Sequence, residues 1–220
     1  MTEQHRNVLE NALDELPLVA ILRGITADEV EPVADALITA GFRMIEIPLN
    51  SPSPWQSIER LRRHCPAGVL VGAGTVLDGN EVSRLACAGG ELLITPNADP
   101  QIIAAGLGAG LAPVIGCMTP TEALMAARAG ALALKLFPAA RLGSGYFSDL
   151  RAVLPKDLPV LAVGGINGSN MAEWHAAGIG GFGFGGNLYC PGRPPAEVGR
   201  IAADLVAEWR RLDAATELAG

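Results

Sequence analysis

Short apolar runs recur along the chain and are separated by longer, more polar stretches. A short apolar run between turn residues is typical of a buried β-strand. Eight such runs are present, at residues 18–24, 43–49, 69–74, 91–96, 112–116, 131–137, 159–165 and 180–186. The stretches between them leave room for helices, so the pattern predicts alternating strands and helices.

The segments between the runs carry the start and stop signals of α-helices. Several begin with a residue that caps helix N-termini and end in glycine. The predicted caps are Thr26, Asp99, Thr119 and Asn167. Strands that alternate with helices predict a parallel sheet of the α/β class, because parallel neighbours need crossover connections.

Eight strand–helix units in one domain predict a closed (β/α)₈ barrel, or TIM barrel. An open doubly wound sheet is the alternative, although the turn after the first run lacks the GxGxxG of a Rossmann fold. Residues 1–16 predict an extra N-terminal amphipathic helix, and the residues after Pro195 predict a closing helix. The apolar positions of the first helix are Val8, Leu9, Ala12, Leu13 and Leu16. No linker interrupts the chain, so we expect one domain over residues 1–220.

A lysine interrupts the sixth apolar run. Strand residues alternate between the barrel interior and the surrounding helices. Leu132, Leu134 and Leu136 suit the helix side, which leaves Lys135 inside the barrel mouth. Burial lowers the pKa of an amine, and a neutral lysine forms Schiff bases with carbonyl compounds. The alternatives are a lysine that extends to the surface or makes a structural ion pair.

A lone carboxylate occupies the matching place in the second run. Ile45, Ile47 and Leu49 would face the helices, so Glu46 would face inward. Active sites of (β/α)₈ barrels lie at the C-terminal ends of the strands, where Glu46 and Lys135 would meet. Glu46 is therefore either a catalytic acid or base, or a structural counterion to an inward arginine or lysine.

Three further features belong to the same end of the predicted barrel. Arg23 closes the first run, where it would bind a carboxylate or pair with Glu46. Glycine pairs end the seventh and eighth runs, at Gly164–Gly165 and Gly185–Gly186. Exposed backbone N–H groups before a helix form an anion site, and (β/α)₈ enzymes often bind phosphate there. The alternative is that the glycines only make tight turns.

Composition narrows the class of protein. Half of the residues are apolar and the formal net charge is −7, which disfavours a nucleic-acid partner or an anionic membrane. The four cysteines show no metal or disulfide spacing, and the three histidines lie far apart, so we expect no metal and no cofactor. No apolar run is long enough to span a bilayer. We therefore expect a cytoplasmic protein.

Seven segments together resemble the 2-keto-3-deoxy-6-phosphogluconate and -galactonate aldolases, a family of Schiff-base (class I) aldolases. The segments follow the order of the family and cover essentially the whole chain. They are AILRGI (20–25), IEIPLNSP (45–52), GAGTVL (72–77), ITPN (94–97), ALKLFPA (133–139), AVGGI (162–166) and GGNLY (185–189). The resemblance implies a barrel enzyme, usually a homotrimer, that needs no metal.

The resemblance also implies roles for individual residues. Lys135 would form the imine and Glu46 would be the general acid and base. Arg23, Thr75, Pro96 and Phe137 would line the pyruvate half of the site. The backbone after Gly164–Gly165 and after Gly185–Gly186 would bind the phosphate of a phosphorylated keto-deoxy sugar acid.

Two positions resemble the galactonate branch of the family. Asn50 and Val163 stand where the gluconate enzymes typically carry arginine and threonine. One position departs from the family, since Asn187 follows Gly186 where a serine is common. The gluconate or 4-hydroxy-2-oxoglutarate activity is the first alternative. A phosphosugar isomerase or epimerase with Glu46 as base, or a non-catalytic sugar-phosphate-binding protein, is a more distant one.

Overall fold

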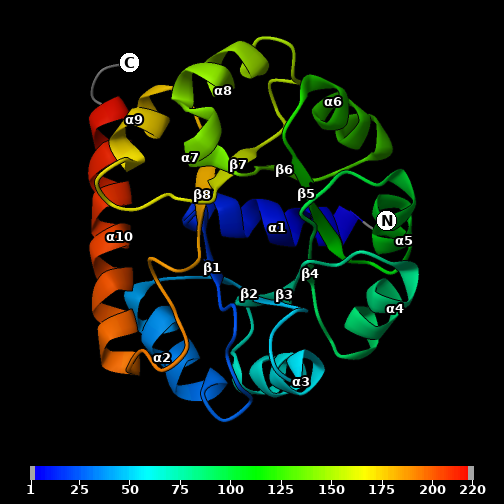
Figure 1. Cartoon of the computed structure of the whole chain (residues 1–220), viewed down its shortest axis with the longest axis vertical. Helices are drawn as coiled ribbons and strands as arrows, with labels where there is room; N and C mark the ends of the chain where they lie inside the picture. Colours follow the sequence, from blue (N-terminus) through cyan, green and yellow to red (C-terminus); the bar gives the residue numbers. More distant parts are fainter. Residues whose placement is uncertain (1–2, 218–220) are drawn as a thin grey trace.

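A computed structural model describes residues 3–217, with side chains described from residue 8 to residue 216. The chain forms one closed barrel of eight parallel strands in the order β1 to β8, ringed by helices (Figure 1). The strands are β1 (Leu18–Ile21), β2 (Met44–Pro48), β3 (Leu70–Gly74), β4 (Leu92–Ile94), β5 (Ala112–Cys117), β6 (Ala133–Leu136), β7 (Val160–Val163) and β8 (Gly181–Phe184). The predicted (β/α)₈ barrel is confirmed, and each strand lies inside its predicted run except β5, which extends one residue further, to Cys117.

Helix α1 precedes the first strand, and the other helices follow the strands and cover the outside of the barrel. The helices are α1 (Glu3–Glu15), α2 (Val30–Ala40), α3 (Pro54–His64), α4 (Gly79–Cys87), α5 (Pro100–Gly108), α6 (Pro120–Ala129), α7 (Ala139–Leu142), α8 (Ser144–Arg151), α9 (Met171–Ala176) and α10 (Pro195–Glu217). The closing helix α10 lies against α2, so the last helix of the outer ring packs beside the first.

The predicted helix caps are correct at two of four positions. Asp99 accepts a hydrogen bond from the N–H of Gln101, and Thr119 forms a capping box with Glu122. Thr26 and Asn167 lie one turn too early, because α2 and α9 begin after Glu29 and Asn170. Each forms a polar turn ahead of its helix, which resembles a cap in sequence.

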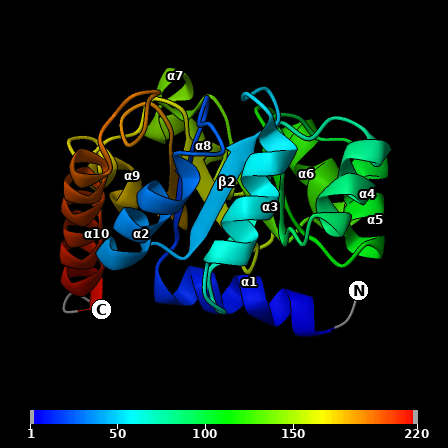
Figure 2. The ribbon, with the colours of Figure 1, turned by 90° about the horizontal axis from the view of Figure 1, so that it is seen from below.

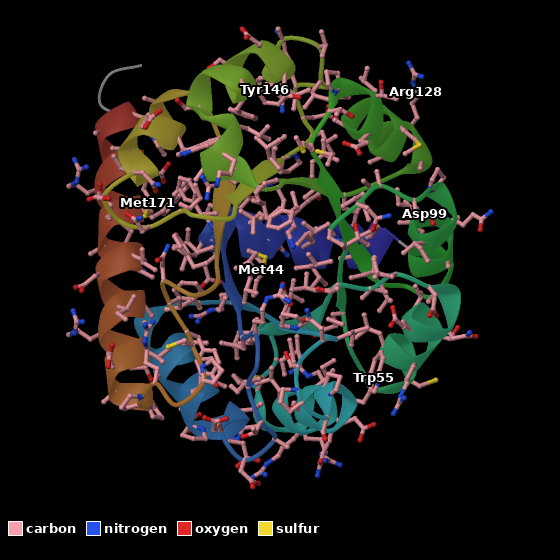
Figure 3. All side chains as sticks on the ribbon, viewed as in Figure 1. Met44, Trp55, Asp99, Arg128, Tyr146 and Met171 are labelled. Atoms are coloured by element: carbon pink, nitrogen blue, oxygen red, sulfur yellow. The ribbon has the colours of Figure 1, made fainter. Side chains whose placement is uncertain are left out.

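The strands separate two layers of apolar side chains. Ile45, Ile47, Leu134 and Leu136 belong to the outer layer between strands and helices. Alternate positions fill the interior, where Met44 lies in the middle of the barrel (Figure 3). The predicted alternation fails only just before β6, where Leu132 packs with the interior layer, because regular strand geometry starts at Ala133.

The extra N-terminal helix closes the floor of the barrel. In the view of Figure 2, α1 lies across the end opposite to the point of β2. Leu9, Ala12 and Leu13 are buried and pack with the interior layer. Val8 was expected on the same apolar face but is 37% exposed. Residues 1 and 2 of the predicted helix lie outside the described residues. Helix α1 thus covers the apolar floor of the barrel.

Leu9→Ala should destabilise the protein by about 2–5 kcal/mol, because it leaves a cavity in the floor. Val8→Ala, one position earlier on the same helix, is the control and should cost less than about 1 kcal/mol. Urea unfolding followed by circular dichroism measures both. Equal, small losses for the two variants would show that α1 does not seal the barrel.

Candidate active site

Lys135 is held inside the barrel by β6. Its side chain is only 6% exposed, and it lines a small cavity together with Ile21, Val114 and Leu161. These apolar neighbours replace water around the amine. Burial is the main influence on Lys135 and lowers the pKa of its amine, with a smaller contribution from the charge of Arg23, while the carboxylate of Glu46 acts in the opposite direction. The sequence prediction of an inward lysine is therefore correct.

Glu46 projects into the same cavity from β2, and it is 1% exposed. Burial raises the pKa of its carboxyl to about 7, although the positive charges of Lys135 and Arg23 and the backbone of Gly74 act against this shift. A carboxyl that titrates near neutral pH both donates and accepts protons efficiently. Among the described residues, its Oε2 has no hydrogen-bond partner. That oxygen remains available to a substrate or a water molecule.

The lysine and the carboxylate influence each other across the cavity without a direct ion pair. Among the described residues, no charged side-chain nitrogen lies within 4.0 Å of the Glu46 carboxylate, and no carboxylate oxygen lies within 4.0 Å of Nζ of Lys135. A tight ion pair would hold the amine protonated and block its lone pair. The counterion alternative for Glu46 therefore fits poorly, and the arrangement favours a nucleophile beside an acid–base group.

Gly74 makes room for the carboxylate. A Cβ at position 74 would lie 2.1 Å from Oε2 and 2.5 Å from Oε1 of Glu46. Any side chain there would displace the carboxyl from its place over β3. The glycine at the end of GAG thus has a steric function that the sequence motif alone does not reveal.

Arg23 lies at the rim and is exposed. Its Nη1 donates a short hydrogen bond to Oδ1 of Asn50, so it does not make the alternative salt bridge to Glu46. The N–H of Gly24 donates to Oγ of Ser51 at 2.9 Å, which joins the same two loops a second time. The guanidinium still lies near enough to influence Glu46 and Lys135. Sequence reasoning named Arg23 and Asn50 but not their contact.

Phe137 and Val163 border the amine from two sides. The Nζ of Lys135 lies 5.3 Å from the centre of the Phe137 ring. The ring is 38% exposed and lies close to Gly164, so it covers the amine and does not belong to the core. Val163 is buried and lines the cavity. Both residues limit the access of water to the lysine.

Thr75 follows β3 directly and Pro96 is the second residue after β4, at the same end of the barrel. Neither is among the residues that line the cavity. Thr75 adopts φ = 59°, a left-handed conformation that is costly for a β-branched residue. Such strain gathers at functional sites, where surrounding structure maintains it. The strain is a reason to place Thr75 in the site that is independent of the sequence motif.

The loops after β7 and β8 form the third part of the site. We call residues 164–167 loop 7 and residues 185–188 loop 8. In loop 7, every carbonyl from Gly164 to Ile166 accepts a hydrogen bond. The donors are the N–H of Ala140 at 3.0 Å, Nδ2 of Asn170 at 3.0 Å and Nδ2 of Asn187 at 2.6 Å, respectively. The carbonyl dipoles of this loop are therefore fixed by the protein.

Loop 8 repeats the arrangement. The carbonyl of Gly185 accepts from the N–H groups of Leu188 and Tyr189 at 2.8 and 2.9 Å. Arg193 donates from Nη1 to the carbonyls of Asn187 and Gly186 at 3.1 and 3.4 Å. Both loops come together because β7 pairs with β8.

The N–H groups on the other side of these peptide units are free. Those of Gly165, Ile166, Gly186 and Asn187 donate to no acceptor within residues 3–217. In a trans peptide the N–H points away from the C=O, so fixed carbonyls leave four amides to face elsewhere. Neighbouring free amides are an anion site. The glycine pairs thus have the surroundings expected of an anion site, and Gly164 and Gly165 also adopt the positive φ angles of a tight turn.

Sequence reasoning missed the residues that support this site from behind. Gly74, Asn170 and Arg193 were not singled out. An asparagine after a glycine pair was a signal for Asn187, although its partner in loop 7 could not be inferred. Arg193 gave no signal, because the carbonyls that it contacts precede it by six and seven residues.

Within residues 3–217, no group of three histidine, cysteine, aspartate or glutamate side chains is placed to hold a metal ion. The described helices include none that is long and apolar enough to cross a bilayer.

Comparison with known proteins gives a consistent result. The family model of KDPG and KHG aldolases matches residues 9–191. A probable 2-dehydro-3-deoxy-6-phosphogalactonate aldolase of Rhizobium meliloti is 49% identical over 195 residues, which are 89% of this chain and 92% of that protein. The 2-dehydro-3-deoxy-6-phosphogalactonate aldolase of Escherichia coli K12 is 45% identical over 196 residues, or 89% of this chain and 96% of the relative. A solved structure described as native KDPGal superposes with a TM-score of 0.89 at 44% identity, and covers 91% of this chain and 97% of its own.

The titration of Glu46 should appear in the pH dependence of stability. Its carboxyl has an ordinary pKa of 4.5 and a folded pKa of about 7, so the folded protein binds more protons between these values. The free energy of unfolding therefore loses a contribution as pH rises through this window. Glu46→Gln has no such titration. Relative to wild type, the variant should gain about 2–3 kcal/mol between pH 4.5 and pH 7.5.

Urea unfolding at a series of pH values measures this difference. Glu59→Gln, on an exposed position of α3, is the control for removing one carboxylate. If the Glu46→Gln and wild-type curves stay parallel from pH 4.5 to pH 7.5, the carboxyl is not held in the apolar environment described above.

Proposed function

The chain belongs to the family of KDPG and KHG aldolases, which makes it a carbon–carbon lyase, and on that premise we propose its substrate and the work of each residue. The substrate is 2-dehydro-3-deoxy-6-phosphogalactonate. The products are pyruvate and D-glyceraldehyde 3-phosphate. The names of the two relatives above support this choice, and the site has the groups that the reaction requires.

One observation carries the proposal. A buried lysine with a lowered pKa and a buried carboxyl with a raised pKa line the same apolar cavity at the active end of a (β/α)₈ barrel. A structural ion pair would stabilise both charges, and so would raise the pKa of the lysine and lower the pKa of the carboxyl. The two groups here are shifted in the opposite directions, which is typical of functional sites. Imine chemistry needs both shifts.

Imine formation is the first stage. The lone pair of Nζ of Lys135 attacks the C2 carbonyl carbon of the substrate. Glu46 delivers a proton to the carbinolamine oxygen, water leaves and a protonated imine remains. The positive nitrogen then draws electrons from the C3–C4 bond, which is the function that a bound metal has in other aldolases.

Carbon–carbon cleavage is the second stage. Glu46 takes the proton of the C4 hydroxyl, C4 becomes the aldehyde carbon, and the electrons of the C3–C4 bond enter the imine to give an enamine. D-glyceraldehyde 3-phosphate leaves. A proton returns to C3, and water hydrolyses the pyruvate imine to release pyruvate and the free amine. A carboxyl with a pKa of about 7 is suited to both directions of proton transfer.

The pyruvate half of the substrate would lie between the rim and the lysine. Arg23 would bind the carboxylate, with Asn50 fixing its guanidinium. Thr75 and Pro96 would border the same end, and the ring of Phe137 would cover the imine. A fixed carboxylate holds C2 of the substrate beside Nζ of Lys135. The attack of the amine on C2 then proceeds like an intramolecular reaction, which is faster than one between separate molecules.

The phosphate of the substrate would bind between loop 7 and loop 8. The free N–H groups of Gly165, Ile166, Gly186 and Asn187 are suited to a doubly charged anion. Gly164 and Gly185 begin the two loops and also present their backbone there. A substrate that spans from Lys135 to this site would have a keto acid at one end and a phosphate at the other.

Two positions bear on the configuration at C4. Val163 lines the cavity beside Lys135, so an apolar side chain lies where a hydroxyl of the substrate would pass. Asn50 accepts a hydrogen bond from Arg23 and stands where the gluconate enzymes typically carry an arginine. Both favour the galactonate substrate over the gluconate alternative. We further propose a homotrimer in the cytoplasm, as the family resemblance implies, and size-exclusion chromatography with light scattering would test the trimer.

Lys135→Ala should lower cleavage of 2-dehydro-3-deoxy-6-phosphogalactonate by about 10⁴-fold or more, because no other group can form the imine. The matched control is Lys156→Ala, since Lys156 is exposed and is the other lysine of the chain. Pyruvate release is followed with lactate dehydrogenase, and circular dichroism checks the fold. Near-full activity of the Lys135 variant would refute the mechanism.

The same assay separates the rival functions. An isomerase or epimerase would convert a phosphosugar without forming pyruvate, and a binding protein would convert nothing. If wild type releases no pyruvate from either epimer of the substrate, the proposed function is wrong, whatever the two lysine variants do.

Wild type should prefer the galacto epimer, and Val163→Thr should reduce that preference by about 10-fold, because the new hydroxyl can bond to the C4 hydroxyl of the gluco epimer. Val153→Thr, an exposed position after α8, is the control for the same substitution. The ratio of kcat/KM for the two epimers measures the effect. An unchanged ratio would remove Val163 from the specificity of the site.

A further inference from the structure

The anion site of this chain is held in shape by side chains that do not belong to the motifs. We propose that Asn187 and Arg193 are positioning residues that lock loop 7 and loop 8 into a single phosphate cradle. The inference rests on the proposed function for the identity of the anion. The hydrogen bonds that support it do not depend on that identity.

Asn187 joins the two loops across the sequence. Its Nδ2 donates to the carbonyl of Ile166 at 2.6 Å, although the residues lie 21 positions apart. A side-chain amide used in this way does not replace the phosphate-binding hydroxyl that a serine would provide. It fixes loop 7 instead. The departure from the family's serine thus exchanges a contact to the ligand for a contact between the loops.

Arg193 acts on loop 8 alone. Its Nη1 donates to the carbonyls of Gly186 and Asn187, and its Nε is paired with Glu197 at 3.4 Å. The side chain is only 18% exposed, so it is enclosed between its partners. A paired arginine whose N–H groups contact carbonyls contributes orientation more than free positive charge.

Each hydrogen bond sets the direction of a free amide. The carbonyl of Gly186 and the N–H of Asn187 belong to the same planar peptide unit, so holding the oxygen turns the hydrogen to the opposite side. Asn170 has the matching role in loop 7, where its bond to the carbonyl of Gly165 orients the N–H of Ile166. A preorganised cradle avoids the cost of ordering the loops when the ligand binds.

The test compares aldehydes with and without phosphate in the condensation direction. Asn187→Ala and Arg193→Ala should each raise KM for D-glyceraldehyde 3-phosphate by about 10-fold, as expected for a lost positioning hydrogen bond at an anion. With D-glyceraldehyde the rates should stay within about twofold of wild type, as should deuterium exchange into the methyl group of pyruvate. Arg200→Ala is the charge-matched control, since Arg200 is exposed and pairs only with Asp204 among the described residues.

A second measurement requires no catalysis. Amide hydrogen exchange at Asn167, whose N–H in loop 7 donates to Oδ1 of Asn170, should become about 10-fold faster in Asn187→Ala, because the tether from loop 8 is lost. In Arg193→Ala the increase should be confined to Leu188, whose N–H in loop 8 donates to the carbonyl of Gly185. A general loss of stability would instead speed exchange throughout the barrel, and urea unfolding reports it.

The outcomes separate the inference from the proposed function. If wild type condenses neither aldehyde with pyruvate, the proposed function fails, and the exchange data still test the tether. If wild type is active but the variants lose equal activity with both aldehydes, Asn187 and Arg193 do not position a phosphate cradle. Unchanged exchange of loop 7 in Asn187→Ala would also overturn the inference.

Discussion

The removal of water from around one amine and one carboxyl is the constraint on which the rest of the structure depends. Lys135 and Glu46 are each almost fully buried, and burial is the largest influence on the pKa of both groups. Each charge partly offsets the penalty of the other, yet the two groups do not form a close ion pair. Both shifts suit the proposed roles of the two groups, a nucleophilic amine and a carboxyl that exchanges protons near neutral pH.

The fold supplies that environment from every side. Helix α1 closes the floor, the interior layer that includes Met44 fills the centre, and Phe137 covers the top. The rim is polar, since Arg23 contacts Asn50 there and loops 7 and 8 present their amides. A substrate with two negative ends and a carbonyl near one of them fits this division. In the proposed reaction, the apolar centre adjusts the reactivity of the lysine, and the polar rim aligns the substrate with it.

Much of this arrangement could be predicted from the sequence because it depends on periodicity. Alternation along β2 and β6 predicted that Glu46 and Lys135 face inward, and glycine pairs indicated the loops that are proposed to bind phosphate. Contacts between distant segments could not be predicted. The steric need for Gly74, the tether from Asn187 to Ile166 and the contacts of Arg193 depend on distances that no spacing encodes. The predictions for Val8 and for the caps at Thr26 and Asn167 were wrong for a related reason. Side-chain type alone does not determine the edge of the apolar face of a helix to within one residue, or the start of a helix to within one turn.

The central claim is that the buried amine of Lys135 bonds covalently to a keto acid, and chemical trapping tests it directly. The protein is incubated with pyruvate, reduced with sodium borohydride, digested and mapped by mass spectrometry. With Lys135 and Lys156 as the lysines of the chain, the peptides distinguish the two sites unambiguously. The account predicts a reduced pyruvate adduct on the peptide that contains Lys135. An adduct confined to Lys156 or the N-terminal amine, or no adduct from a protein that releases pyruvate, would contradict it.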